Sequence, residues 1–268
     1  MLASGLIHAV VNGIIKAGRD KMSGRALMDG FSALLVVPAA FLVPLPEHAW
    51  HWLALSWLAH GLYLVAMIRS YELADMSVAY PVARGLAPLL AAGAAVAFFG
   101  EPVTPVVVLG IFAIAAGVVL VGVSHAVDRR ALLWAALTGG SAAAYTVIDA
   151  QGVRAAPSAV SYIVWTFLML GAGIGAVFAL WRGRGFLPAA AAQWRAGLVA
   201  GALSVVTYGL ALMAFRLGGT PRLAALRETS ILFAAMIAVV FLKERLGRVR
   251  LAGVLAIAAG AIGLIAVR

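Results

Sequence analysis

The chain has 268 residues, of which 64% are hydrophobic and 11% charged, and its mean hydropathy is +1.05. Because a soluble domain is about half apolar and about a quarter charged, this composition excludes a soluble enzyme, a disordered chain and a nucleic-acid-binding domain. The net charge of +10 comes from Lys and Arg that stand singly or in small groups between apolar runs, and the lack of cysteine excludes disulfides, thiolate metal sites and cysteine catalysis.

Apolar runs of membrane-helix length follow one another along the whole chain. A spanning helix needs about 20 residues, so this length predicts roughly ten spans joined by short loops. The first run has neither a basic region before it nor a small-residue cleavage site after it, so we expect no cleaved signal peptide. In chain order the predicted spans are residues 2–16, 26–44, 50–70, 76–99, 103–123, 131–149, 158–181, 196–216, 221–242 and 246–267.

The loops on the two sides of these spans differ in charge. One set of loops carries 14 Lys and Arg, and the opposite set, with the chain end, carries 4. The positive-inside rule places the basic loops in the cytoplasm. We therefore predict a multi-pass protein of the plasma (inner) membrane with both termini outside.

The fourth and fifth predicted spans repeat in the ninth and tenth at an offset of 143 residues. Arg84 falls on Arg227 and Glu101 on Glu244, and the run Ala-Ile-Ala-Ala-Gly at 113–117 returns at 256–260. Charged residues in register with the apolar run make a chance match improbable.

A fainter repeat relates the first and sixth spans, where His8 and Asn12 fall on Tyr145 and Asp149. The chain therefore divides into two halves of five spans, residues 1–127 and 128–268. An odd number of spans per half inverts the second half in the membrane. This is the inverted-repeat plan of secondary transporters, whose binding site lies between the repeats.

Several short motifs resemble the EamA-type transporters of the drug/metabolite transporter (DMT) superfamily. The motifs are Pro81-x-x-Arg84-x-x-x-Pro88, Gly100-Glu101, Lys243-Glu244-Arg245-Leu246 with Gly253, His8-Ala9-x-x-Asn12 and Tyr145-Thr146-x-x-Asp149. The resemblance implies an all-α polytopic membrane protein with ten transmembrane helices in two inverted five-helix repeats around a central cavity. It leaves the substrate open, because such proteins handle amino acids, metabolites, drugs and nucleotide sugars. They are usually drawn with both termini in the cytoplasm, which is the reverse of what the charges predict here.

Four ionisable residues stand out inside predicted spans: Arg84, Asp149, Arg227 and Glu228. A charge in lipid costs about 2.5–3.5 kcal/mol on insertion scales, so such groups usually face a cavity or a partner. The helix rise puts Arg84 roughly 9 Å inside the apolar core, and Arg227 at the equivalent depth of the other leaflet. Each arginine either lines a cavity or extends to the headgroups. We predict the contacts Asp149–Arg227 and Asn12–Arg84, the alternative for Asp149 being a helix-end carboxylate in headgroup water.

Glu228 has no acidic counterpart in the first half, where Gly85 stands. A carboxylate beside an arginine is either a structural ion pair or a proton carrier, and Asp149 is the second candidate for proton coupling. Pro81 and Pro88 lie on the helix face of Arg84, where they either kink the helix or serve packing.

The predicted substrate-binding set combines cations, polar groups and tyrosines that fall inside spans, although packing alone would also account for the tyrosines. Its members are Arg84, Arg227, Asn12, His8, Tyr63, Tyr80, Tyr145 and Tyr208. The sequence contains no nucleotide-binding loop, no Ser/His/Asp pattern and no metal-ligand cluster, so we predict no enzyme, no cofactor and no metal.

These observations predict a secondary transporter, a permease or exporter, that works by alternating access. Because arginine binds carboxylates bidentately, the substrate is expected to be amino-acid-like or carboxylate-bearing. The expected partners are this small molecule, the lipid bilayer and protons as a candidate coupling ion, without nucleic acid, in a monomer or homodimer. The alternatives are a proton-coupled multidrug or cation exporter that uses Glu228 or Asp149, and a lipid flippase.

Overall fold

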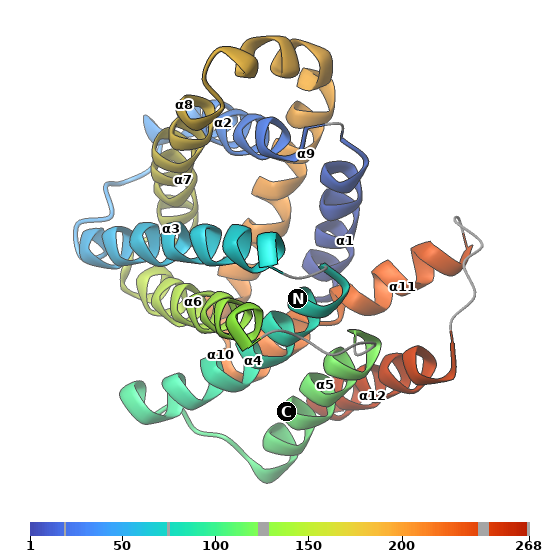
Figure 1. The fold of residues 1–268 in the computed structure, drawn as a ribbon. Coiled ribbons are helices and arrows are strands. Elements are labelled where there is room, and N and C mark those ends of the chain that lie inside the picture. Colours follow the sequence, from blue (N-terminus) through green and yellow to red (C-terminus); the bar gives the residue numbers. More distant parts are fainter. Residues whose placement is uncertain (19, 74–75, 123–128, 241–246, 267–268) are drawn as a thin grey trace.

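The computed structural model describes residues 1–18, 20–73, 76–122, 129–240 and 247–266, and all regular structure in them is helical. Each of the ten predicted segments contains helix (Figure 1). Glu244 and the predicted join near residue 128 fall at or beside residues outside this description. The α-helices are α1 (Leu2–Ala17), α2 (Lys21–Ala40), α3 (Trp50–Leu73), α4 (Met76–Phe99), α5 (Pro105–Gly122), α6 (Arg129–Ala155), α7 (Ala159–Leu170), α8 (Ala176–Arg182), α9 (Phe186–Leu217), α10 (Thr220–Arg227), α11 (Ser230–Val240) and α12 (Arg248–Ala266).

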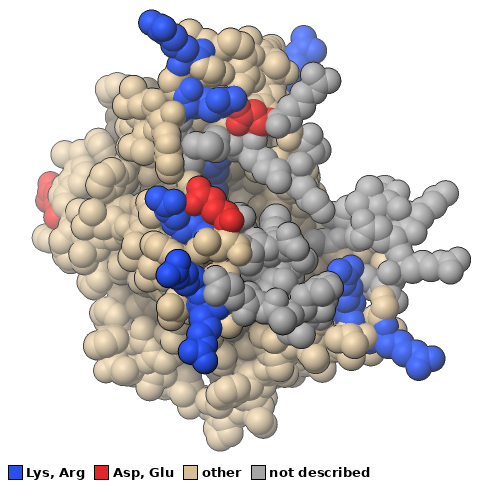
Figure 2. Space-filling model, viewed as in Figure 1, with Lys and Arg blue, Asp and Glu red and all other residues tan. Residues whose placement is uncertain are grey.

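Length and composition make these helices suited to a membrane. Five helical stretches of the described chain are long and apolar enough to cross one, and two shorter apolar helices cover Leu2–Ile15 and Pro105–Leu120. Large apolar side chains such as Leu34, Leu109 and Leu133 are exposed, as expected of a surface that meets lipid. Figure 2 shows the same property on one face, where Lys and Arg are scattered over a surface that is mostly uncharged. The stretches are Trp50–Ser70, Val82–Phe99, Arg129–Ala155, Ala159–Leu217 and Arg248–Ala266.

The helices pack in pairs that are distant in sequence. In Figure 1, α5 lies along α12, and α3 lies along α6. One apolar core gathers around Tyr162 and Phe215, between α6, α7 and α9. A second gathers around Ile114 and Ile257, where α5 and α12 meet, and it also takes in residues of α4 and α10. The pocket described below lies where α4, α6 and α10 approach one another.

The ninth predicted span is not one helix. α10 ends at Arg227 and α11 begins at Ser230, with Glu228 and Thr229 between them. The amide nitrogens of these two residues bond to carbonyls three residues back, and the Thr229 hydroxyl donates to the Leu226 carbonyl at 2.7 Å. The tightened turn thus satisfies hydrogen bonds of backbone groups that would have no partner in lipid. A broken helix thus brings irregular backbone beside the pocket.

The seventh span is also irregular. A π-helical turn (η1, Gly171–Gly175) joins α7 to α8. A Cβ at Gly171 would collide with Ala33 on α2, and one at Gly173 with the Trp57 ring on α3. The two glycines therefore allow α2 and α3 to pack closely against the π-helical turn.

One end of the helix bundle is held by the carboxylate of Glu101, in the loop between α4 and α5. It accepts hydrogen bonds from Arg154 Nη1 at 2.5 Å and from the Thr220 amide at 2.6 Å and hydroxyl at 2.7 Å. Arg154 also donates to the Phe215 and Gly218 carbonyls, which close α9. Burial disfavours the charge of Glu101, but these bonds outweigh it and lower the pKa of the carboxyl below its usual value. Glu101 thereby joins the α4–α5 loop to the end of α6 and the start of α10, and Arg154 extends the network to the end of α9.

At the opposite end of the bundle, Asp20 connects the start of α2 to the end of α8 through fewer hydrogen bonds. Its side chain caps α2 by accepting from the Ser23 amide, and it pairs with Arg182 at the end of α8 at 2.7 Å. Burial opposes the charge, but the bonds from Arg182 and Ser23 prevail and lower the pKa of Asp20.

Candidate functional site

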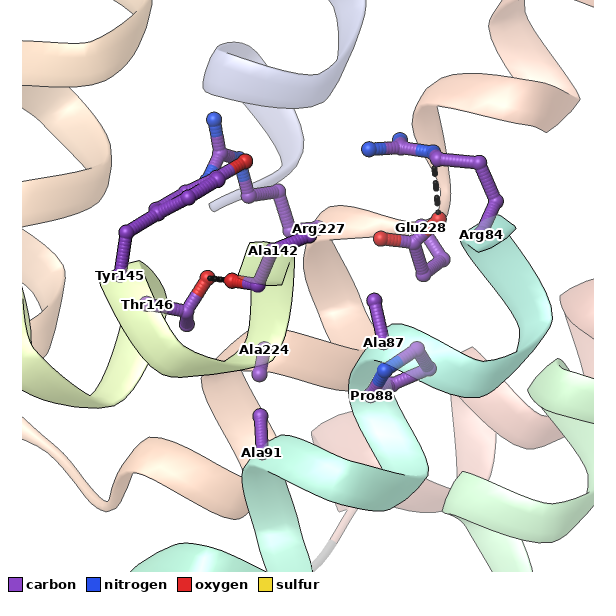
Figure 3. Close-up of a pocket in the computed structure, with 10 residues that line it drawn as sticks. All are labelled: Arg84, Ala87, Pro88, Ala91, Ala142, Tyr145, Thr146, Ala224, Arg227 and Glu228. Carbon is purple, nitrogen blue, oxygen red and sulfur yellow. Dashed lines mark hydrogen bonds and ion pairs between the residues drawn. The ribbon is translucent and has the colours of Figure 1, made fainter. Parts of the chain in front are cut away.

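A pocket opens between α4, α6 and the α10–α11 break. It encloses about 300 Å³ of space that no atom fills, counted out to its mouth. Its walls combine two arginines and one glutamate with small or mildly polar side chains. Figure 3 shows Arg227 and Tyr145 on one side and Arg84 with Glu228 on the other. The lining residues are Arg84, Ala87, Pro88, Ala91, Ala142, Tyr145, Thr146, Ala224, Arg227 and Glu228.

Arg84 and Glu228 form an ion pair across the two halves of the chain. Arg84 Nε lies 2.9 Å from Glu228 Oε2, and Arg84 Nη2 donates to the Ser230 hydroxyl at 2.9 Å. The two side chains are only 15% and 5% exposed, so water screens the pair weakly. Glu228 lies in the helix break and Ser230 opens α11, which explains why they can reach a residue on α4.

This pairing joins residues at similar positions along two helices. Arg84 is the ninth residue of α4 and Glu228 the ninth from Thr220, so each lies about 12 Å from its helix start at 1.5 Å per residue. The contact therefore relates Arg84 to the residue that follows Arg227, its counterpart in the second half.

Arg227 is the last residue of α10, where the helix C-terminus favours a cation. Its guanidinium carbon lies 5.0 Å from the centre of the Tyr208 ring, a cation–π distance. It takes part in none of the ion pairs formed by the described residues. The pocket therefore presents one arginine engaged with a carboxylate and one that is not.

The predicted polar contact between Asp149 and Arg227 is not among the hydrogen bonds and ion pairs of the described residues. Among the described contacts, Asp149 accepts hydrogen bonds from the Tyr162 hydroxyl at 2.8 Å and from the Tyr208 hydroxyl. It is completely buried rather than in headgroup water. The Tyr208 ring instead connects the two groups, since its hydroxyl reaches Asp149 and Arg227 lies over its ring.

Three other predicted site residues, His8, Asn12 and Tyr63, do not line the pocket. His8, on α1, is half-buried in the electrostatic field of Arg84, Arg227 and Arg25. Asn12 is exposed on α1, and no hydrogen bond to Arg84 is among those that the structure describes for it. The Tyr63 ring meets the Tyr145 ring edge to face, 5.6 Å between centres.

Of the prolines predicted to kink α4, Pro88 lines the pocket. α4 is assigned as one helix from Met76 to Phe99 through both Pro81 and Pro88. The side chains of Tyr80 and Pro81 are outside the description.

The sequence reasoning missed Asp29 and His60, which are buried, and the pairing of Arg25, whose side chain is 32% exposed. Arg25 was counted among loop charges, but it lies on α2 and pairs with Asp29 at 2.8 Å. His60 stacks on Tyr145 with 4.0 Å between ring centres and bonds to Ser56. The spacing of Arg25 and Asp29 by four residues, beside an apolar run, is the signal that would have found the pair.

The site contains polar anchors for an organic ion but no arrangement for a metal. Among the described residues, no group of three His, Cys, Asp or Glu could hold one. Two guanidiniums, one carboxylate and an alanine-rich wall suit a small ligand with a charged group and an apolar body.

Comparison with known proteins gives one family and one fold. The model of the family described as "EamA-like transporter family" matches residues 129–266. No curated protein matches the sequence. Twenty-seven chains of solved structures match the fold. One of them, described as "Crystal structure of protein", is 19% identical with a TM-score of 0.73, and the match covers 98% of this chain and 92% of that chain. At that identity the likeness establishes the fold alone.

Proposed function

Because the chain belongs to the EamA-like transporter family, within the DMT superfamily, we propose that it is a secondary transporter that moves a small, carboxylate-bearing metabolite by alternating access. Membership makes the chain a multi-pass membrane transporter and not an enzyme. The substrate class, the repeat architecture and the orientation are the parts that we propose.

Ten spans in two inverted repeats, residues 1–127 and 128–268, account for the way α5 crosses α12. A Cβ at Gly110 would lie 3.2 Å from the Gly260 carbonyl oxygen, and one at Gly117 would lie 2.6 Å from that of Gly253. At the offset of 143, Gly110 corresponds to Gly253 and Gly117 to Gly260. Each glycine thus meets the counterpart of the other, as a pseudo-twofold axis requires.

The observation that carries the substrate class is the pair of arginines in one pocket. Arg84 and Arg227 occupy equivalent positions of the two halves and both line it. Arg84 has Glu228, whereas Arg227 has no carboxylate among the described residues. A guanidinium within the apolar part of a membrane without a counterion is costly, and a substrate carboxylate would supply one through two parallel hydrogen bonds.

Uptake into proteoliposomes tests this function. Labelled amino acids and organic acids are offered with and without an imposed pH gradient. We expect uptake of at least one carboxylate by the wild type and a loss of tenfold or more in Arg227→Gln. Arg222→Gln is the matched control, since Arg222 lies on the same helix, α10, but does not line the pocket.

The second candidate is a proton-coupled cation exporter, favoured by the buried Glu228 carboxylate in the pocket wall. It predicts movement of a lipophilic cation such as ethidium that survives Arg227→Gln and fails in Glu228→Gln. That outcome, together with no uptake of any acid, would replace the anion transporter by the exporter.

The charge bias of the loops supports termini outside the cytoplasm. Alkaline phosphatase fused after residue 268 should be active in whole cells, because the enzyme folds only outside the cytoplasm. Activity of a cytoplasmic reporter at the same position would reverse the orientation.

A further inference from the structure

The formal charges that face the pocket do not cancel. Its lining contains two cations, Arg84 and Arg227, and one anion, Glu228, while the other lining side chains are uncharged. As formal charges, these groups leave an excess of one positive charge on the lining. In water such an excess is of little consequence, but a pocket within the apolar part of a membrane holds it in a poorer dielectric.

The neighbouring charges lie outside the surface that a ligand in the pocket would touch. Asp149 is completely buried, is absent from the lining and has both oxygens occupied by Tyr162 and Tyr208. Arg25 and Asp29 neutralise each other at 2.8 Å. A ligand can therefore reach the guanidinium of Arg227 but cannot reach the carboxylate behind Tyr208.

On the basis of the proposed function, we infer that Glu228 determines which net charge the pocket accepts in a substrate. The pocket then selects a small monocarboxylate with one net negative charge. One carboxylate on Arg227 brings the pocket to neutrality. A second carboxylate would leave one negative charge in excess and would be repelled by Glu228. A zwitterion would leave the positive excess in place.

The rest of the lining fits the body of such a molecule. Four alanines, Ala87, Ala91, Ala142 and Ala224, together with Pro88 form a small apolar wall. They offer no hydrogen-bond donor to a second anionic group.

Three acids with a four-carbon backbone test the inference: butyrate with one negative charge, succinate with two, and 4-aminobutyrate with none. Their binding to the purified full-length protein in detergent is measured by isothermal titration calorimetry at neutral pH. We expect the wild type to bind butyrate at least tenfold more tightly than either other acid. In Glu228→Gln, which raises the excess to two charges, the ratio should move at least tenfold toward succinate.

Two further variants test the same inference in case Glu228→Gln does not fold. Glu228→Asp retains the charge and should retain the wild-type order of the three acids. The double variant Arg84→Gln/Glu228→Gln removes the ion pair as a unit, restores an excess of one charge and should restore the preference for butyrate.

The failures are distinguishable. If butyrate binding is lost in Arg227→Gln but its ratio to succinate stays within threefold in Glu228→Gln, the charge selection is wrong and the anion transporter stands. If Arg227→Gln binds butyrate as the wild type does, the arginine pocket itself is wrong, and both proposals fall. If the wild type binds none of the three acids, the monocarboxylate selection is overturned, and the uptake panel alone decides the function.

Discussion

Asp149 is a carboxylate with no exposed surface, and such a group is tolerated only when its oxygens are hydrogen bonded. Tyr162 and Tyr208 supply one donor each, but only Tyr208 also lies beneath the guanidinium of Arg227. Both tyrosines therefore donate a hydrogen bond to Asp149, but only Tyr208 also contacts an arginine of the pocket lining.

This inequality gives a prediction for Tyr208→Phe and Tyr162→Phe. A hydrogen bond to a charged group contributes about 1.5–3 kcal/mol, so both variants should lose stability in detergent by a similar amount. Only Tyr208→Phe releases the ring that supports Arg227, so it alone should weaken the apparent affinity for the transported carboxylate, by about three- to tenfold. Thermal melts and uptake kinetics measure the two effects, and an equal change of affinity in both variants would contradict the prediction.

At this scale the sequence singled out five of the residues that line the pocket but did not predict how they pair. Arg84, Pro88, Tyr145, Arg227 and Glu228 were all candidates, and all line one pocket. Their type and position inside apolar runs were enough to single them out. The partner of Asp149 could not be predicted, because it depends on how α7 and α9 are rotated about their own axes. A ten-span sequence with tyrosines on several helices leaves that rotation open.

At the scale of helices, the Glu101 network should respond to pH. Its folded pKa lies below the unfolded value, so the stabilisation is complete above about pH 4.3, the usual value for Glu, and is lost as the pH falls through the folded pKa. Glu101→Gln should therefore lower the melting temperature at pH 7 and flatten its fall between pH 5 and pH 3.

The matched control for this prediction is Glu72→Gln. Glu72 pairs with Arg69 at 2.9 Å, but both side chains are more than half exposed, and such a surface pair contributes about 0–1 kcal/mol. Its loss should leave the melting curve at pH 7 nearly unchanged. An equal loss in both variants would mean that the Glu101 network does not hold the helix ends together.

The crossing of α5 and α12 gives a second prediction at this scale. A Cβ at Gly260 would lie 2.7 Å from the Gly110 carbonyl oxygen, whereas a Cβ at Gly263, on the same helix, would meet nothing within 4 Å. Gly260→Val should separate the helices and cost stability of about 1–3 kcal/mol by overpacking, while Gly263→Val should be tolerated. Thermal melts in detergent compare the two, and a stable Gly260→Val protein would show that the helices need not be so close.

Hydropathy predicted where helix would be found, because ten apolar runs leave the backbone no other way to satisfy its hydrogen bonds in lipid. It did not predict that the ninth span breaks at Glu228 and Thr229, or that the seventh contains a π-helical turn. A window average of hydropathy does not register where a hydroxyl or a glycine interrupts the ladder of backbone hydrogen bonds. Such interruptions depend on contacts with other helices.

For the whole molecule, the internal repeat was the most informative feature of the sequence, since it joined distant parts of the chain without any contact being known. The reciprocal approach of Gly110 to Gly260 and of Gly117 to Gly253 is what the offset of 143 leads one to expect. The repeat also has a limit. Gly85 stands where the second half has Glu228, so the one carboxylate of the pocket breaks the symmetry.

Among the described residues Arg227 forms no ion pair, and this has a kinetic consequence. A carrier that alternates between two sides has to return after it releases its cargo, and here the empty pocket would return with an uncompensated charge buried in the membrane. With the proposed monocarboxylate bound, the formal charges of the pocket lining would cancel and this barrier would fall. The protein should therefore be an obligatory exchanger, in which one anion moves out only as another moves in.

Counterflow measures this directly. Proteoliposomes loaded with the labelled anion should empty at least tenfold faster when the same unlabelled anion is present outside than when it is absent. Equal rates would mean that the empty pocket crosses as readily as the full one, and that Arg227 finds another counterion on the way.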